Sequence, residues 1–145
     1  MEKRKTVFVE GSISSNFIAS SIEKHQTKTT IGAHNFFLGQ VRADQIEGKI
    51  VQAIDYSAYQ EMAEDKFYEI QEATLTKFDL TSLHIYHSIG KVEVGEICLF
   101  VLVSAAHRRV TFDALEYLVD TIKKEVPIFG KEIFEDETHT WKVNN

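Results

Sequence analysis

The sequence predicts an α+β protein in which a mostly antiparallel sheet packs against two long helices. Two segments, 60–78 and 108–125, carry apolar residues at helical spacing. Shorter segments rich in aromatic and β-branched residues surround them, without the strict strand–helix alternation of a parallel sheet. The 145 residues contain no Pro/Gly-rich linker and no internal repeat, so we expect a single domain over residues 1–145.

The first half of the chain is expected to hold three strands and two helices. In the first helix, Ser12 or Ser14 is suitably placed to act as the N-cap. The second and third strands flank a polar loop and are expected to pair as a hairpin. These predicted elements are a strand over Lys5–Val9, a helix over Ser14–Lys24, strands over Gly32–Val41 and Lys49–Tyr59, and a helix over Gln60–Phe78.

The second half contains the most apolar strand and the second long helix. The strand over Glu96–Ala105 is almost entirely apolar, which favours the middle of the sheet. Pro127 ends the second helix, because the residue before a proline is disfavoured in helical conformation. The predicted elements are a strand over Ser82–His87, a turn-rich crossing over Ile89–Gly95, the strand over Glu96–Ala105, a helix over Arg108–Glu125, and a hairpin of Lys131–Glu135 and Thr138–Val143.

Composition excludes several classes of function. The formal net charge is −6, which argues against a general nucleic-acid binder. The longest apolar run, Ile97–Val103, has the length of a strand and is too short to span a membrane. The N-terminus lacks a signal-peptide core, so a cytoplasmic location is expected.

Cysteine and histidine usage favours neither redox nor metal chemistry. The single cysteine, Cys98, cannot form an intramolecular disulfide, and its apolar surroundings indicate a buried core residue. His84 and His87 are three residues apart, which places them on opposite faces of a strand. We therefore expect no metal site.

A cationic cluster marks the start of the second long helix. His107, Arg108 and Arg109 stand at the junction between a buried strand and this helix. The first N–H groups of a helix lack internal partners, and the helix dipole favours an anion there. Together with the two arginines, these groups would bind a phosphate or a carboxylate. The alternative is a surface turn with solvated arginines.

Two further segments carry cations next to apolar residues. Arg42 ends an apolar strand, where it either points into a cleft or is an ordinary strand-end residue. Lys123 and Lys124 stand in the last turn of the second long helix, where lysines complement the helix dipole without any further role. The segment that follows, 126–129, is unusually apolar for a surface loop, which makes a binding role plausible.

Taken in order, these motifs resemble the large, catalytic subunit of molybdopterin synthase, the MoaE family. The matching segments are GQVR at Gly39–Arg42, EGK at Glu47–Lys49, YSAYQEMA at Tyr56–Ala63, HSIGKVEVGE at His87–Glu96, SAAHRRVTFDA at Ser104–Ala114 and KKEVPIFGKE at Lys123–Glu132, with Trp141 near the end. The resemblance covers most of the chain from Gly32 onward. It implies a hammerhead-like α+β fold.

The resemblance also implies an activity and its partners. Two large subunits pair, and each binds a small ubiquitin-like sulfur-carrier subunit whose Gly-Gly tail ends in a thiocarboxylate. Two such sulfurs convert cyclic pyranopterin monophosphate into molybdopterin and create its dithiolene. Neither a metal nor a nucleotide cofactor is expected. The assembly expected is a homodimer within a heterotetramer.

Residue roles follow from the same resemblance. Arg42, His107 and Arg108 match positions that bind substrate. Lys123 matches the lysine regarded as essential for catalysis, and it is also expected to bind substrate. Where the family usually has Lys-Lys or Lys-Arg, this chain has Gly130 and Lys131.

Lys131 is therefore a second catalytic candidate, although strand alternation would turn it away from the pocket. Ser57 and Ser88 also depart from the family pattern. The missing lysine at Gly130 keeps an alternative open, a non-catalytic relative that binds a ubiquitin-like partner as a regulatory or scaffold module.

Overall fold

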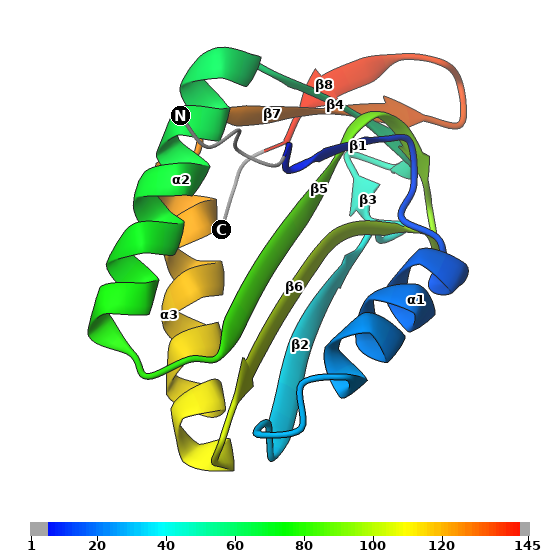
Figure 1. The fold of residues 1–145 in the computed structure, drawn as a ribbon. Helices are drawn as coiled ribbons and strands as arrows, with labels where there is room; N and C mark the ends of the chain where they lie inside the picture. Colours follow the sequence, from blue (N-terminus) through cyan, green and yellow to red (C-terminus); the bar gives the residue numbers. More distant parts are fainter. Residues whose placement is uncertain (1–5, 143–145) are drawn as a thin grey trace.

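The computed structural model describes residues 6–142 and contains three helices and eight strands in that range. The helices are α1 (Ser15–Gln26), α2 (Gln60–Lys77) and α3 (Arg108–Glu125). The strands are β1 (Phe8–Glu10), β2 (Ala33–Gln40), β3 (Gln45–Ile46), β4 (Lys49–Ala58), β5 (Ser82–Glu93), β6 (Ile97–Ala105), β7 (Ile128–Phe134) and β8 (His139–Trp141). The helices α2 and α3 run side by side (Figure 1).

The strands form one twisted sheet in the order β2-β6-β5-β4-β7-β8. The short strands β1 and β3 lie off this path and pair with β5 and β4. Among the described residues only the β1–β5 pairing is parallel. The predicted α+β class, with a mostly antiparallel sheet and two long helices, is confirmed.

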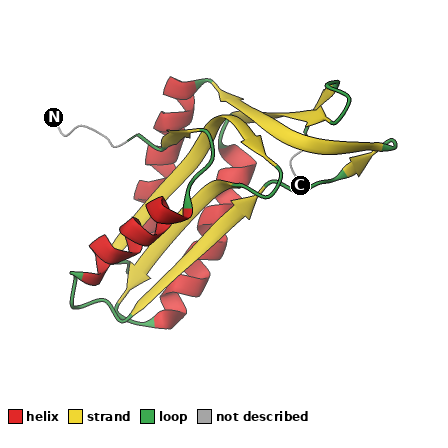
Figure 2. Ribbon diagram, turned by 90° about the vertical axis from the view of Figure 1, so that its right-hand side faces the viewer, coloured by secondary structure: helices red, strands yellow, loops and turns green. Residues whose placement is uncertain are grey.

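Both faces of β6 are buried, which explains its apolar sequence. Val101 and Val103 belong to the large core cluster, together with side chains of α2 and α3. Phe100 and Leu102 belong to a smaller cluster that includes Ile18 of α1. Because side chains alternate along a strand, α1 covers the sheet face opposite α2 and α3 (Figure 2). The prediction that this strand is central is confirmed by its position between β2 and β5.

The strand β5 is longer than predicted and connects two parts of the sheet. Residues 82–87 pair with β6, whereas residues 90–93 pair with β4. The predicted turn-rich crossing over Ile89–Gly95 is therefore wrong for most of its length. Gly90 adopts φ +88, a left-handed conformation that lets the chain bend without ending the strand. The true turn falls at Val94–Gly95.

The predicted hairpin of strands 32–41 and 49–59 is also wrong. The strand β2 pairs with β6, a strand distant in sequence, while β4 pairs locally with the two-residue β3. Glu47 and Gly48 have φ +51 and +81 and form the tight turn between β3 and β4. The short strand β3, which lies within a polar segment, thus forms the hairpin with β4.

Helix boundaries agree closely with the sequence. The Ser14 hydroxyl accepts a hydrogen bond from the Phe17 N–H at 3.1 Å, so Ser14 rather than Ser12 is the N-cap of α1.

The predicted first strand and last hairpin extend to Lys5 and Val143, which lie outside the described residues. No helix within residues 6–142 is both long and apolar enough to cross a membrane.

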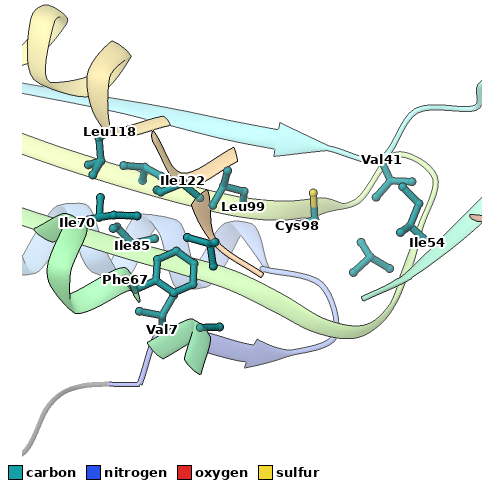
Figure 3. Close-up of a cluster of buried hydrophobic side chains, with 14 of the residues drawn as sticks. Val7, Val41, Ile54, Phe67, Ile70, Ile85, Cys98, Leu99, Leu118 and Ile122 are labelled. Atoms are coloured by element: carbon teal, nitrogen blue, oxygen red, sulfur yellow. The ribbon is translucent and has the colours of Figure 1, made fainter. Parts of the chain in front are cut away.

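The large core cluster extends from between the long helices to the end of β2 and the middle of β4. Phe67 and Ile70 of α2 and Leu118 of α3 lie at one end, and Val41 and Ile54 lie at the other (Figure 3). Beyond Leu118, Ile122 continues the buried face of α3 toward Leu99 and Cys98. The C-terminal end of α3 is therefore fixed against the sheet at the junction of its two parts.

Candidate active site

An inner cavity of about 400 Å³ opens where the two parts of the sheet meet the C-terminal end of α3. It is bounded by the ends of β2 and β6, by β4 and β7, and by the last turn of α3. Apolar core side chains, including Ile54, Leu99 and Ile122, form part of its wall. Its charged and titratable lining includes Arg42, Tyr56, His87, Lys123, Glu132 and Lys142.

Lys123 is held in place by its neighbours on α3. Ile122 is buried and the C-cap residue Val126 is nearly so, and both also line the cavity. Lys123 itself is exposed on the cavity side. The apolar face of the helix thus fixes the backbone that carries the ammonium group at the cavity.

Arg42 also lines the cavity, from the chain segment that follows β2. The preceding residue, Val41, is 2% exposed, and its backbone bonds to Glu96 and Gly95 at 3.0 and 2.9 Å. This anchoring fixes the chain just before Arg42. The Arg42 Nη2 lies 3.2 Å from Asp44 Oδ2, an ion pair between two partly exposed groups. Asp44 therefore offsets part of the Arg42 charge.

A short chain of polar groups lies inside the cavity. The Tyr56 hydroxyl donates to Cys98 Sγ at 3.4 Å, and the thiol donates to the Gly39 carbonyl at 3.4 Å. Burial raises the pKa of Tyr56 well above its usual range, and Cys98 and Glu132 raise it further. Tyr56 consequently stays a neutral hydrogen-bond donor. Cys98 is buried and engaged as a donor, in agreement with its predicted core position.

His87 is a buried, neutral ring in the same wall. Its Nδ1 lies 2.7 Å from the Ser88 carbonyl, which can only accept, so Nδ1 carries the proton. Burial lowers the pKa of His87 to about 4; the Ser88 hydrogen bond acts in the opposite direction, and the Lys123 charge lowers the pKa further. His87 is thus uncharged at neutral pH. Its ring packs edge-on against Tyr56, with centroids 5.1 Å apart.

A second hollow, the outer groove, adjoins the inner cavity and measures about 530 Å³. Phe129 and Trp141, which are 43% and 58% exposed, supply much of its apolar surface. The two hollows share Lys123, Val126, Ile128, Gly130 and Lys142. The two lysines therefore lie on the border between the hollows.

The structure brings together only part of the predicted site. Arg42 and Lys123 line the same cavity. His107 and Arg108 lie at the other end of α3, exposed, with no side-chain cap from His107. A helix rises 1.5 Å per residue, so Arg108 and Lys123 are separated by about 22 Å along the axis. Within one copy of the chain these two groups cannot bind one small molecule.

Lys131 faces away from the cavity. Gly130 and Glu132 both line it, whereas Lys131 does not, because neighbouring strand residues point to opposite faces. Lys131 pairs instead with Asp55 on β4 and Trp141 on β8. Lys131 was predicted as a second catalytic candidate that strand alternation would turn away from the pocket, and the register of β7 does turn it to the reverse side.

Several lining residues were not identified from the sequence as site residues. Tyr56 and His87 lie within the motifs quoted above, but His87 was considered only as a metal ligand. Glu132 could have been found, since it is two residues from Gly130 and shares its face. Lys142 gave no sequence signal, because its position depends on the register of the last hairpin. Among residues 6–142, no three His, Cys, Asp or Glu side chains are grouped for metal binding.

The fold and the inner cavity define an α+β protein with a partly enclosed site whose lining carries three cationic residues, Arg42, Lys123 and Lys142, and two acidic ones, Asp44 and Glu132. The family model described as MoaE protein matches residues 13–125, and the chain belongs to this family.

Relatives and solved structures agree with this assignment. The molybdopterin synthase catalytic subunit of Rattus norvegicus is 37% identical over 113 residues, which cover 78% of this chain and 56% of the rat protein. The crystal structure of molybdopterin synthase from Staphylococcus aureus matches with a TM-score of 0.80 at 30% identity, over 98% of this chain and 99% of that one. A Helicobacter pylori chain, solved as a protein–protein complex of subunits 1 and 2 of molybdopterin-converting factor, shares the fold (TM-score 0.79, 16% identity, 92% and 87% covered).

Proposed function

We propose that this chain is the catalytic subunit of a molybdopterin synthase, a sulfurtransferase that converts cyclic pyranopterin monophosphate into molybdopterin. The observation that carries the proposal is the inner cavity, where Arg42 and Lys123 approach from separate elements. A cyclic phosphate and a thiocarboxylate are both anions, and a cavity bordered by cations stabilises them and the negative charge that develops between them. Sulfur comes from the partner, so the buried Cys98 is not required to react.

Lys123 is proposed as the central catalytic group. The carrier sulfur bonds to a side-chain carbon of the pterin and displaces an oxygen substituent from that carbon, so a thioester then links the two molecules. Water adds to the acyl carbon and loses a proton to the solvent, so the resulting tetrahedral intermediate carries a negative oxygen. Its collapse breaks the carbon–sulfur bond, leaving the sulfur on the pterin and a carboxylate on the carrier. The Lys123 ammonium stabilises the negative oxygen. Tyr56 stays protonated and is available as a neutral donor.

The outer groove is proposed to receive the tail of the small ubiquitin-like carrier. Its aromatic residues Phe129 and Trp141 are exposed, and it leads directly to Lys123. A tail that ends in two glycines has no side chains to exclude it from a narrow passage. The thiocarboxylate would then reach the border between the hollows, while the pterin occupies the inner cavity.

His107 and Arg108 are proposed to act on the cavity of a second copy of the chain. They cannot reach Lys123 of their own copy, and an anion or a partner is needed to offset cations at a helix N-terminus. In a two-fold dimer each copy presents the same surface to the other, so one helix start can complete the opposite cavity. A homodimer within a heterotetramer supplies this arrangement.

The second candidate is a non-catalytic module that binds the carrier, and Gly130 is the observation that favours it. The two candidates are separated by mixing the purified chain with a ubiquitin-like carrier bearing a C-terminal thiocarboxylate and with cyclic pyranopterin monophosphate. Formation of molybdopterin supports the synthase. Carrier binding without product supports the module. The cytoplasmic location stays a prediction, which cell fractionation tests.

A further inference from the structure

Lys142 continues the pairing of the last hairpin beyond the end of β8. Lys131 pairs with Trp141 and Glu132 with Thr140, so the next residue along the chain lies opposite Gly130. The Lys142 N–H donates to the Gly130 carbonyl at 2.8 Å and fixes this register. Because side chains alternate, Lys142 shares the face of the sheet that carries Glu132, the face that lines the inner cavity.

Gly130 lies opposite Lys142 in a closely packed part of the sheet. A Cβ at position 130 would lie 3.7 Å from the Lys142 Cβ, 3.0 Å from Ile54 Cγ2 and 3.4 Å from Tyr56 Cε1. A longer side chain at this position would occupy the strip between β4 and the end of the hairpin. Glycine at position 130 therefore places no side chain beside Lys142. Lys142 accordingly lines both the inner cavity and the outer groove.

The charges around the border make Lys142 and Lys123 different from Arg42. The Arg42 guanidinium is paired with Asp44. Neither Lys123 nor Lys142 lies within ion-pair distance of any carboxylate in the described part of the chain. Both lysines line both hollows and lack a carboxylate partner, so each is available to bind an anion there.

We propose that Lys142 is a second substrate-binding lysine of the sulfur-transfer site, and that its ammonium group binds the anionic pterin precursor together with Lys123. This proposal rests on the function proposed above. It also explains how a chain with Gly130 presents two lysines to the cavity, since the neighbouring strand supplies the charge. The hairpin end, rather than β7, then determines the affinity for the precursor.

The test compares three variants of the full chain. Lys142→Met removes the charge and keeps the length, and Lys142→Arg keeps the charge. The control, Lys24→Met, removes an exposed lysine from the last turn of α1, on the opposite face of the sheet. The dissociation constant for cyclic pyranopterin monophosphate is measured by calorimetry, and KM, kcat and the melting temperature are measured in parallel.

We expect Lys142→Met to weaken binding of the precursor and raise its KM by roughly tenfold, the effect of losing one hydrogen bond to a charged group. Lys142→Arg should bind within about threefold of the unmodified chain, and Lys24→Met should match it. The melting temperature of Lys142→Met should be unchanged, which excludes a general loss of structure.

Two results would overturn the inference. One is an affinity of Lys142→Met equal to that of Lys24→Met. The other is an equal loss in Lys142→Met and Lys142→Arg together with a lower melting temperature, which indicates a structural role. Failure of the proposed function looks different, because the unmodified chain then forms no molybdopterin. The calorimetric comparison still decides in that case whether Lys142 binds the anion.

Discussion

The two ends of α3 carry cations in opposite settings. At the C-terminal end, Lys123 and Lys124 complement the helix dipole, and the surrounding strands enclose a cavity beside them. At the N-terminal end, Arg108 and Arg109 oppose the dipole, no acidic residue stands in the first turn, and the side chains are exposed. Helix stability accounts for the first cluster but not for the second. The C-terminal cluster has a cavity beside it within one copy of the chain. The N-terminal cluster is exposed and has no such cavity among the hollows described above.

Replacing Lys123 tests the enclosed end and should have the largest effect. We expect Lys123→Ala to lower kcat for molybdopterin formation by ~100-fold or more, the range found when one group that stabilises a developing oxyanion is removed. The fold should be retained, because the side chain is exposed and the helix loses only about 0.3–1 kcal/mol of dipole interaction. Steady-state kinetics and a thermal melt measure both quantities. Near-normal turnover would remove Lys123 from the mechanism.

A mixed dimer tests whether the two ends of α3 meet across copies. Arg108→Ala and Lys123→Ala homodimers should each be nearly inactive. A dimer with one copy of each, isolated through two different affinity tags, contains one intact site of two and should recover about half of the unmodified turnover. A mixed dimer as inactive as the two homodimers would show that Arg108 and Lys123 of different copies do not form one site.

The pH dependence of stability tests the burial at the enclosed end. The pKa of His87 is lowered to about 4 in the folded chain and is near 6.5 when unfolded. Between these values the unfolded state binds the proton and the folded state does not. The folded state therefore loses up to about 3 kcal/mol as the pH falls from 6.5 to 4.

Denaturant unfolding at several pH values measures this loss. His87→Phe should show a correspondingly smaller decline over the same window, whatever its stability at neutral pH. Equal declines in both chains would show that His87 does not carry the effect.

The smallest effect is expected for Lys131, on the reverse face of β7. Lys131→Met should leave turnover within about twofold and cost about 0.5 kcal/mol from the cross-strand contacts with Asp55 and Trp141. Parallel assays with Lys142→Met compare two lysines of one hairpin on opposite faces. A large loss of turnover in Lys131→Met alone would contradict the assigned register.

Periodicity predicted the helices well and the long-range pairing poorly. The boundaries of α2 and α3 follow from apolar spacing and from Pro127, both of which are local signals. The strand β2 pairs with β6, whose residues are 57 or more positions away in the sequence. Local sequence signals do not reveal such a pairing, so the prediction wrongly paired this strand with the adjacent one over residues 49–59. The sequence predicts a turn at Gly90, whereas the structure has a bend within a strand. A glycine in the left-handed conformation is expected at either place, so the sequence does not distinguish them.

The site was predictable to the extent that charges stand out in the sequence. Arg42 and Lys123 were found as cations beside apolar segments, and the cavity does join them. The separation of His107 from Lys123 follows from helix length alone and could have been calculated. The position of Lys142 could not be predicted from the sequence, because it depends on the register between β7 and β8. The single-domain organisation stays a prediction, and one cooperative unfolding transition is its test.

The bend in β5 couples the size of the active site to one backbone conformation. Among the described strands β5 alone pairs with both β6 and β4, so the part of the sheet that leads to Arg42 and the part that leads to Lys142 are joined through the strand that carries Gly90. A Cβ there would lie 2.8 Å from Glu10 Oε1 and would have to accept φ +88. The Glu10 side chain is flexible and can move away, so the left-handed backbone is the main obstacle to a side chain here. Such a substitution would strain the strand that joins the two parts of the sheet without changing any residue that lines the cavity.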